Sequence, residues 1–350
     1  MVKRFSLPNP YTNRAAIRSS NHFFGRELDL RDIYTRIAGG QSVMITGERR
    51  IGKSSLLNAI GFSREEYELD PGFGFILLDM QSIAGCTEEA FVENLLTLIS
   101  REMGIALPEM GRRTLEDAAE RIHSHGRRLI IALDEFDVLV WNEKISPEFL
   151  VVLRSWTVRH GFPFVVAFRE GSIDRIVSDE KFGSAFLNLF GSVYVGPLRE
   201  EEARELIRTP ARNHDVEFTD EEVEMVLDIA GYFPLYIQIA CYHLFEFKKL
   251  GKTAEEIAVQ LPRSFAFEAS PHFEYMWWRL SPREQEALRW WVKAGNTEDM
   301  AAEKDLLMKG LLIEERRAIR ISCSLLGEWM DKWEAPAKTV RQTVRDALLM

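Results

Sequence analysis

The sequence contains one complete phosphate-loop motif, and this motif constrains the fold more than any other feature. Residues 47–54 read Gly-Glu-Arg-Arg-Ile-Gly-Lys-Ser, which matches G-x-x-x-x-G-K-[ST] at every fixed position. A short β-branched run, Ser42–Thr46, precedes the loop, and Ser55–Ile60 continues after it as a helix. The order of strand, loop and helix therefore predicts a nucleoside triphosphate site rather than a chance match on a glycine turn.

The residue types in the loop each suit phosphate chemistry. Successive backbone N–H groups and the positive end of the following helix would face one anion. Lys53 is expected to reach the β- and γ-phosphate oxygens as a point charge, and the Ser54 hydroxyl is expected to coordinate Mg²⁺. The loop residues predicted to contact the nucleotide are Gly47, Arg50, Ile51, Gly52, Lys53, Ser54 and Ser55.

Four further short apolar runs read as buried strands, and helical segments separate them. These predicted strands are Phe75–Asp79, Leu129–Leu133, Phe164–Phe168 and Ser192–Val195. Strands that alternate with helices favour a parallel sheet covered on both faces. The sequence therefore predicts an α/β fold of the P-loop NTPase kind.

An acidic pair and an arginine follow two of these strands. Ligands of parallel sheets bind beyond the carboxyl ends of the strands, where the phosphate loop, Asp134-Glu135 and Arg169 would all emerge. We expect the acidic pair on the strand beside the phosphate loop, with Asp134 holding Mg²⁺ through its water shell. Glu135 would orient or deprotonate the attacking water. Arg169 would contact the γ-phosphate or transmit its presence, although an exposed loop arginine is an equal alternative.

The predicted catalytic residues are thus Glu135, Lys53 and Arg169, and the predicted metal ligands are Ser54 and Asp134. No N-K-x-D element for reading guanine occurs in the chain. Adenine is the better prediction for the base, so the expected cofactors are ATP or ADP with Mg²⁺.

The remainder of the chain divides by pattern. Residues 1–198 are predicted to form the P-loop ATPase core with an N-terminal arm, and residues 199–270 a helical lid. Helices Pro282–Ala294 and Glu298–Lys309 followed by a hairpin predict a winged helix within residues 271–333. Residues 334–350 read as a proline linker and a short helix.

Composition excludes several classes of protein. The 350 residues allow two domains, and the chain has no run of eighteen apolar residues, so we expect a cytoplasmic protein that does not bind membranes. The three cysteines form no C-x-x-C pair, which argues against a zinc site or a disulfide framework. A net charge of −10 argues against non-specific nucleic-acid binding over the whole surface.

Five motifs in order resemble the STAND class of P-loop ATPases and, more distantly, the origin-recognition branch of AAA+ proteins. They are Asn9-Pro10-Tyr11, Phe23-Phe24-Gly25-Arg26-Glu27, the phosphate loop with Ser55, Leu133-Asp134-Glu135-Phe136-Asp137 and the segment from Gly231 to Gln238. The resemblance implies a nucleotide-dependent switch built from core, lid and winged helix. It also implies that Gly25 and Arg26 lie near adenine and ribose, and that Pro234 reaches the nucleotide from the lid.

Three functions remain open at this stage. The leading hypothesis is an ATP-binding, slowly hydrolysing switch that controls a protein partner or self-association. The second is a DNA-associated ATPase of the replication-loader or transposon-helper type. Ten basic and ten acidic residues between Trp277 and Trp333 disfavour it, as do the acids Glu298, Asp299, Glu303 and Asp305 on the predicted recognition helix. A small-molecule phosphotransferase is third, because it would have no use for the lid and winged helix. The cluster Trp277, Trp278, Trp290 and Trp291 is expected to pack within or between domains.

Overall fold

The chain forms two compact units. The computed structural model describes residues 8–12, 15–105, 112–169, 189–315 and 318–332. One unit comprises Ala15–Val195, and the other combines Met1–Arg14 with Gly196–Met350. The linker and short helix predicted for residues 334–350 lie outside the described residues.

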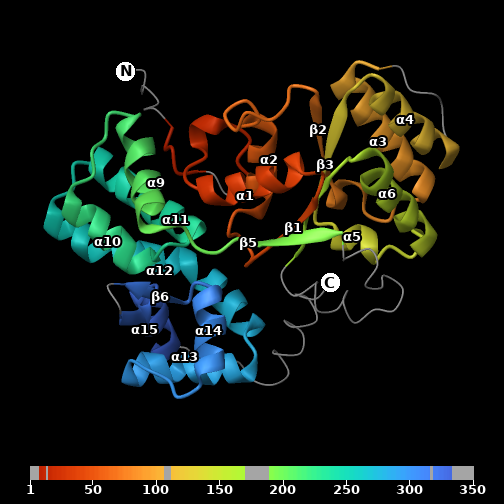
Figure 1. Cartoon of the computed structure of the whole chain (residues 1–350). Helices are drawn as coiled ribbons and strands as arrows, with labels where there is room; N and C mark the ends of the chain where they lie inside the picture. The colour runs from red at the N-terminus through yellow and green to blue at the C-terminus, as the bar shows by residue number, and fades with distance from the viewer. Residues whose placement is uncertain (1–7, 13–14, 106–111, 170–188, 316–317, 333–350) are drawn as a thin grey trace. The chain divides into compact units, whose positions relative to one another are not determined.

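The first unit is built on a parallel sheet, which confirms the predicted fold class (Figure 1). Within the described residues its strand order is β2-β3-β4-β1-β5. The strands are β1 Ser42–Thr46, β2 Phe73–Asp79, β3 Arg128–Asp134, β4 Phe164–Ala167 and β5 Phe190–Tyr194. β1 has the predicted bounds, whereas β2 begins at Phe73 rather than Phe75 and β5 at Phe190 rather than Ser192.

The strand that carries the acidic pair is not beside the strand of the phosphate loop, and this expectation was wrong. β4 lies between them, with Val165 paired to Val43 of β1 on one side and to Ala132 of β3 on the other. All of these runs are short and apolar, so the hydrophobic pattern identifies buried strands without encoding their order. Only the pairing in the folded sheet decides which strands are neighbours.

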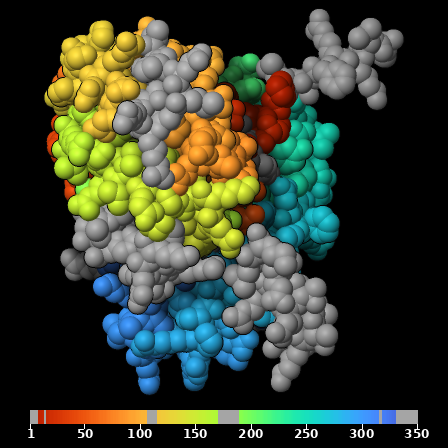
Figure 2. Space-filling view, turned by 90° about the vertical axis from the view of Figure 1, so that its right-hand side faces the viewer, coloured from red at the N-terminus to blue at the C-terminus, as the bar shows by residue number. Residues whose placement is uncertain are grey.

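Helices cover both faces of the sheet. Figure 1 shows α1 (Glu27–Ala38) and α2 (Lys53–Phe62) on one side of the strands, and α3 (Glu88–Met103), α4 (Arg112–Ser124) and α6 (Pro147–His160) on the other. Figure 2 shows α4 and α6 as adjoining yellow and yellow-green surfaces. Alternate residues of β3 serve the two faces, since Leu129, Ile131 and Leu133 join the core formed with α3, α4 and α6. This alternation explains why β3 is apolar throughout.

The second unit is mainly helical. Its described elements are α9 Glu200–Arg212, α10 Asp220–Ala230, α11 Pro234–Lys249, α12 Ala254–Arg279, α13 Pro282–Ala294, α14 Met300–Met308, β6 Leu312–Glu315, β7 Ala318–Ile321 and α15 Ser324–Lys332. β6 and β7 pair antiparallel. No helix among the described residues has the length and apolar character needed to cross a bilayer.

The lid and winged-helix boundary predicted near residue 270 falls inside α12. Pro262 and Pro271 lie within this helix, and each removes one backbone donor. The helix continues because every fourth residue is buried, at positions Ile257, Leu261, Phe265, Ala269, Phe273 and Trp277. This continuous apolar stripe stabilises the helix across both prolines, so residues 199–270 and 271–332 share one long element.

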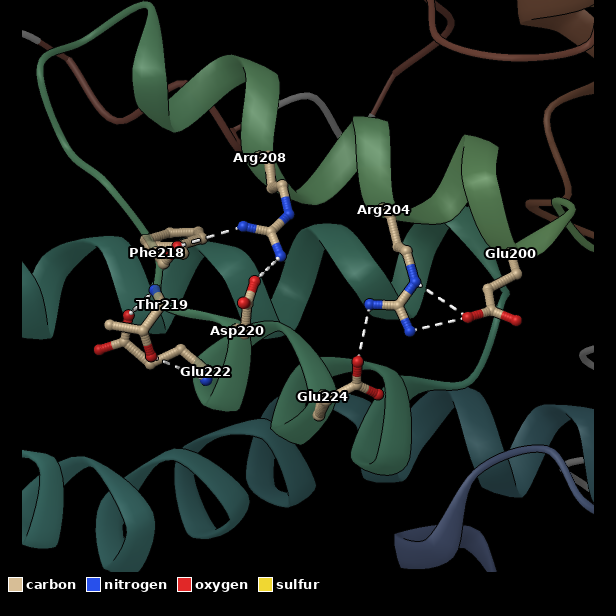
Figure 3. A network of polar contacts seen from close by, with 8 residues as sticks. All are labelled: Glu200, Arg204, Arg208, Phe218, Thr219, Asp220, Glu222 and Glu224. Atoms are coloured by element: carbon tan, nitrogen blue, oxygen red, sulfur yellow. Dashed lines mark hydrogen bonds and ion pairs between the residues drawn. The ribbon is translucent and has the colours of Figure 1, made fainter.

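Charged side chains join α9 to α10 (Figure 3). Arg204 on α9 contacts Glu200 one turn earlier and Glu224 on α10. Arg208, one turn further along α9, donates to the Phe218 carbonyl and pairs with Asp220. Because these groups are partly exposed, each ion pair contributes about 1 kcal/mol or less to the free energy of unfolding. The network therefore mainly fixes the register of the two helices.

The N-terminal arm packs with the helical unit, whereas the sequence grouped it with the ATPase core. The Asn9 amide donates to the Tyr242 carbonyl at 2.9 Å and to Glu246 on α11 at 2.8 Å. The fully buried Tyr11 hydroxyl accepts from the Ala211 N–H at 3.1 Å and donates to the Ile207 carbonyl. These two groups would bond to each other in a regular helix, so the hydroxyl is inserted into the backbone ladder of α9 beside Pro210.

Removing this hydroxyl is expected to destabilise the helical unit. Burial raises the pKa of Tyr11, so the hydroxyl keeps the proton that it donates. Tyr11→Phe leaves a buried N–H and a buried carbonyl without their partner and should cost about 1–3 kcal/mol of unfolding free energy, measured by urea denaturation. Tyr67→Phe is the control, since its hydroxyl bonds the Glu27 carbonyl at an exposed site. Equal effects of the two substitutions would mean that the inserted hydroxyl contributes nothing.

Candidate nucleotide site

Two glycines allow the phosphate loop to take its course. Gly47 has φ +144°, and a Cβ atom there would lie 2.3 Å from the Val195 carbonyl oxygen, so no side chain fits. Gly52 has φ +110°, and a Cβ there would meet nothing within 4 Å. The loop is thus packed tightly at its first glycine and opens onto free space at its second, immediately before α2 begins at Lys53. That open side is where an anion would meet the helix N-terminus.

The middle of the loop is anchored to the core. The Ile51 side chain is buried, and the Ile51 carbonyl accepts a 3.0 Å hydrogen bond from Nη2 of Arg26. Arg26 is itself buried, and both Arg26 and Gly25 have left-handed backbone angles just before α1. The guanidinium therefore supports the loop backbone, a role that sequence reasoning did not assign. The predicted contact of Gly25 and Arg26 with adenine and ribose stays a prediction.

The Lys53 ammonium lies over the loop. Its Nζ donates to the carbonyls of Gly47 at 2.8 Å and Glu48 at 2.9 Å. These bonds fold the side chain back across the loop, so its charge sits among the backbone groups that would surround a phosphate. Phosphate oxygens, which carry a full charge, would compete effectively with these neutral carbonyls for the same protons.

Asp134 meets the end of the phosphate loop although β4 separates their strands. The Asp134 carboxylate lies near the Ser54 hydroxyl and accepts a hydrogen bond from the Glu135 N–H at 3.0 Å. Burial raises the pKa of Asp134; the Ser54 hydroxyl opposes this rise, and the neighbouring Asp79 carboxylate adds to it. Asp79 is the partner of Asp134 in the β2–β3 register, so two carboxylates stand side by side at the strand ends.

The pair Ser54 and Asp134 suits a magnesium ion. Both supply oxygen donors, the ligand type that Mg²⁺ prefers. Among the described residues no group of three or more His, Cys, Asp or Glu side chains could enclose a metal. An ion here would therefore take its remaining ligands from phosphate oxygens and water, which is the usual manner of Mg²⁺ in nucleotide sites.

Glu135 has an unusual backbone and one unsatisfied oxygen. Its φ is +51°, in the left-handed region that a non-glycine residue rarely adopts. Gln81, just beyond β2, lies near the carboxylate, whose buried Oε2 atom has no partner among the described residues. Burial raises the pKa of Glu135, and the nearby Arg169 guanidinium opposes that rise. An orphan carboxylate oxygen of this kind is suited to receive a proton from water.

Arg169 is held by an acid that sequence reasoning quoted but did not assign. Asp137, at the start of the four-residue helix α5 (Asp137–Val140), is completely buried. Its carboxylate accepts from the backbone N–H of Arg169 at 3.1 Å and from the Nε of the same residue. The Arg169 guanidinium lies over the Trp141 ring, 5.5 Å from its centroid. Arg169 is thus an ordered side chain at the end of β4, not a loose loop arginine.

The other predicted site residues divide between the units. The Ser55 hydroxyl accepts a 3.0 Å hydrogen bond from the Ile17 N–H, so it holds the segment before α1 against α2. Pro234 belongs to the helical unit, where it is the first residue of α11. Contacts of Ser55 and Pro234 with nucleotide stay predictions.

Asp79, Gln81 and Asp137 are the polar residues at this edge that sequence reasoning missed. A signal was available for all three, because each lies within four residues of the end of a predicted strand. In a parallel sheet those positions share one edge, so any polar side chain there is a candidate for the site.

Comparison with known proteins decides the family. The model of the family described as Novel STAND NTPase 1 matches residues 12–258. This chain belongs to that family. The match confirms the resemblance drawn from the motifs and makes the chain a P-loop NTPase. Curated proteins include no significant match to the sequence.

Solved structures support the fold of this STAND NTPase. A Walker-type ATPase of Pyrococcus abyssi has a TM-score of 0.57 at 17% identity, covering 92% of this chain and 99% of its own. The ORC2 protein of Aeropyrum pernix, solved as ADPNP-ADP complexes, has a TM-score of 0.55 at 15% identity, covering 92% of this chain and 96% of its own. At these identities the similarity concerns the fold alone.

The packing of Gly47 gives the sharpest test of the loop. Gly47→Ala should abolish nucleotide binding in calorimetry, because the new methyl group would displace the Val195 backbone and with it the loop. Gly40→Ala is the control, since Gly40 also has a positive φ, +75°, but has no neighbour within 4 Å of the added Cβ. Nucleotide affinity that survives in Gly47→Ala would contradict the assigned loop geometry.

Proposed function

We propose that this STAND NTPase is an ATP-binding, slowly hydrolysing molecular switch that controls association with a protein partner or with further copies of itself. The observation that carries the proposal is the closeness of the Ser54 hydroxyl to the Asp134 carboxylate. The end of the phosphate loop thus lies near the acidic pair although β4 separates their strands. A phosphate-binding element and a water-activating element thereby share one site, as hydrolysis requires.

The residues divide the chemistry among them. The loop amides and Lys53 would bind the phosphates. Ser54 and Asp134 would hold the ion, which when bound would neutralise charge on the phosphate oxygens. Glu135 takes a proton from the attacking water through its unpartnered oxygen. Arg169 contacts the γ-phosphate. Adenine is favoured by the absence of a guanine-reading element in the sequence and by the ADPNP-ADP complexes of the Aeropyrum pernix protein.

We infer slow hydrolysis from the switch role itself. A switch must keep its nucleotide-bound state long enough for a partner to respond, whereas a metabolic catalyst is selected for rapid turnover.

In the proposed switch, the helical unit would respond to the nucleotide through the segment just before α11. Gly231 has φ +61° and ψ −148°, and a Cβ atom there would lie 2.5 Å from the Ser322 carbonyl oxygen. Next to it, the Cys323 thiol donates to the Ile229 carbonyl at 2.8 Å. The lid proposed for residues 199–270 and the winged helix proposed for 271–333 are therefore held together within one unit. We propose that Pro234 reaches the nucleotide, so that this unit responds to the γ-phosphate.

Hydrolysis and binding should separate in two variants. Glu135→Gln should bind ATP normally but slow hydrolysis by roughly 100-fold or more, because the amide keeps the shape and loses the basic oxygen. Lys53→Ala should lose nucleotide binding itself. Calorimetry and a phosphate-release assay measure the two effects, and hydrolysis by Glu135→Gln at the parental rate would remove Glu135 from the proposed role.

DNA binding is the alternative function, and the positions of several side chains in the C-terminal part of the chain bear on it. Of the acids expected on the recognition helix, Asp299 precedes α14, caps it and pairs with Arg283 at 2.6 Å, and Glu303 is buried. These two acids would repel a phosphate less than the sequence suggested. In the opposite direction, Trp290 is 57% exposed and does not pack as expected, whereas Trp277 and Trp291 are buried. Exposed Trp290 and Met300, 69% exposed, favour a protein-binding surface.

A duplex-binding assay ranks the two functions. We expect no sub-micromolar binding of double-stranded DNA at physiological salt, with or without ATP. Tight binding that weakens steeply with added salt, and that is lost when residues 274–350 are deleted, would reverse the ranking.

A further inference from the structure

Asp137 is a buried carboxylate whose charge is balanced by Arg169. Its side chain is completely buried, and a buried carboxylate is costly without a cationic partner. Arg169 is the only cation that pairs with it among the described residues. The backbone N–H of Arg169 already satisfies one carboxylate oxygen, so the second oxygen is left to bind Nε.

The guanidinium is consequently fixed along its Nε edge, while its other edge is not bound by any described residue. Nε is bound to Asp137, and the face of the group lies over Trp141. Neither Nη1 nor Nη2 makes a hydrogen bond to any residue that the structure describes, and the side chain is 40% exposed. Two terminal nitrogens in one plane form the fork that recognises a phosphate group.

We propose that Asp137 is a positioning residue: it orients Arg169 so that the edge formed by Nη1 and Nη2 recognises the terminal phosphate of a bound nucleoside triphosphate. This rests on the proposed function, in which Arg169 contacts the γ-phosphate. Trp141 restricts the same side chain from its face. A long arginine side chain that is already ordered loses less conformational entropy on binding, so the site gains selectivity for the triphosphate over the diphosphate.

The pairing also predicts that Arg169 keeps its position when a phosphate binds. If Arg169 swung away from Asp137, the buried carboxylate would lose the one cation that pairs with it in the described part of the chain. Binding through Nη1 and Nη2 leaves the Nε bond intact and avoids that loss. A lysine at position 169 would not do both, because its single ammonium has no second edge.

The test compares Asp137→Asn, Arg169→Gln and the double variant, using calorimetry with ADP and with a non-hydrolysable ATP analogue in the presence of Mg²⁺. Each single variant should keep its ADP affinity and lose roughly tenfold in affinity for the analogue, the scale of one charge-assisted hydrogen bond. The double variant should be no worse than Arg169→Gln, since both changes disable the same group.

Glu116→Gln is the matched control. It makes the same carboxylate-to-amide change in the same unit, where Glu116 of α4 pairs with Arg159 of α6 at an exposed site. It should leave the ratio of the two affinities unchanged. Arg169→Lys covers the case in which Asp137→Asn does not fold, because it keeps the charge and removes the Nε donor; it should lose the same selectivity.

Three outcomes would overturn the inference. Asp137→Asn with a parental ratio beside a deficient Arg169→Gln would show that Arg169 works unaided. Equal weakening of ADP and the analogue would show a structural role only, and parental selectivity in Arg169→Lys would show that the oriented edge is irrelevant. Each of these can occur while Glu135→Gln still blocks hydrolysis, so failure of this inference is distinct from failure of the proposed function.

Discussion

The close approach of Gly47 to the Val195 carbonyl is the constraint on which the nucleotide site depends. A backbone carbonyl 2.3 Å from the position of a Cβ atom permits only hydrogen there, and the φ of +144° requires glycine for a second, independent reason. This contact fixes where the loop leaves β1. Ile51 in the core and the Arg26 guanidinium on its carbonyl then fix the loop's middle. Lys53 and Ser54 are positioned as a result.

The polar groups at the strand ends are incompletely partnered. The helical unit holds both kinds of buried polar group: the Tyr11 hydroxyl is satisfied in the ladder of α9, whereas Gln238 Oε1 and the Trp291 indole N–H have no partner among the described residues. At the sheet edge Glu135 keeps an unpartnered oxygen and a left-handed backbone, and Arg169 keeps two terminal nitrogens unbonded to described residues. These deficits cost stability, and at this edge they lie beside the phosphate loop, where a bound nucleotide would complete them.

The helical unit is organised by contacts between segments distant in sequence. Asn9 and Tyr11 bind α11 and α9, and the end of α10 is bound by Ser322 and Cys323. A partner that bound the C-terminal part of this unit would therefore act on the backbone next to Pro234. In the proposed switch, this mechanical link is the route by which nucleotide and partner influence each other, and the influence must be equal in both directions.

The sequence by itself determined the phosphate loop, the strands and the acidic pair. Fixed glycines, an obligatory lysine and short β-branched runs are local requirements, and local requirements leave a pattern that can be read without coordinates. The ends of α3 carry local signals of the same kind, since Thr87 caps its start and Gly104 ends it in a left-handed conformation.

Only the tertiary structure decided which of these elements meet. The place of β4 between β1 and β3, the pairing of buried Asp137 with Arg169, and the insertion of Tyr11 between Ile207 and Ala211 all join residues far apart in the chain. A hydrophobic pattern does not distinguish one buried strand from another. The sequence likewise does not show whether a given carboxylate is buried or exposed to solvent. Strand order and charge pairing are settled by packing and desolvation, which exist only once the chain has folded.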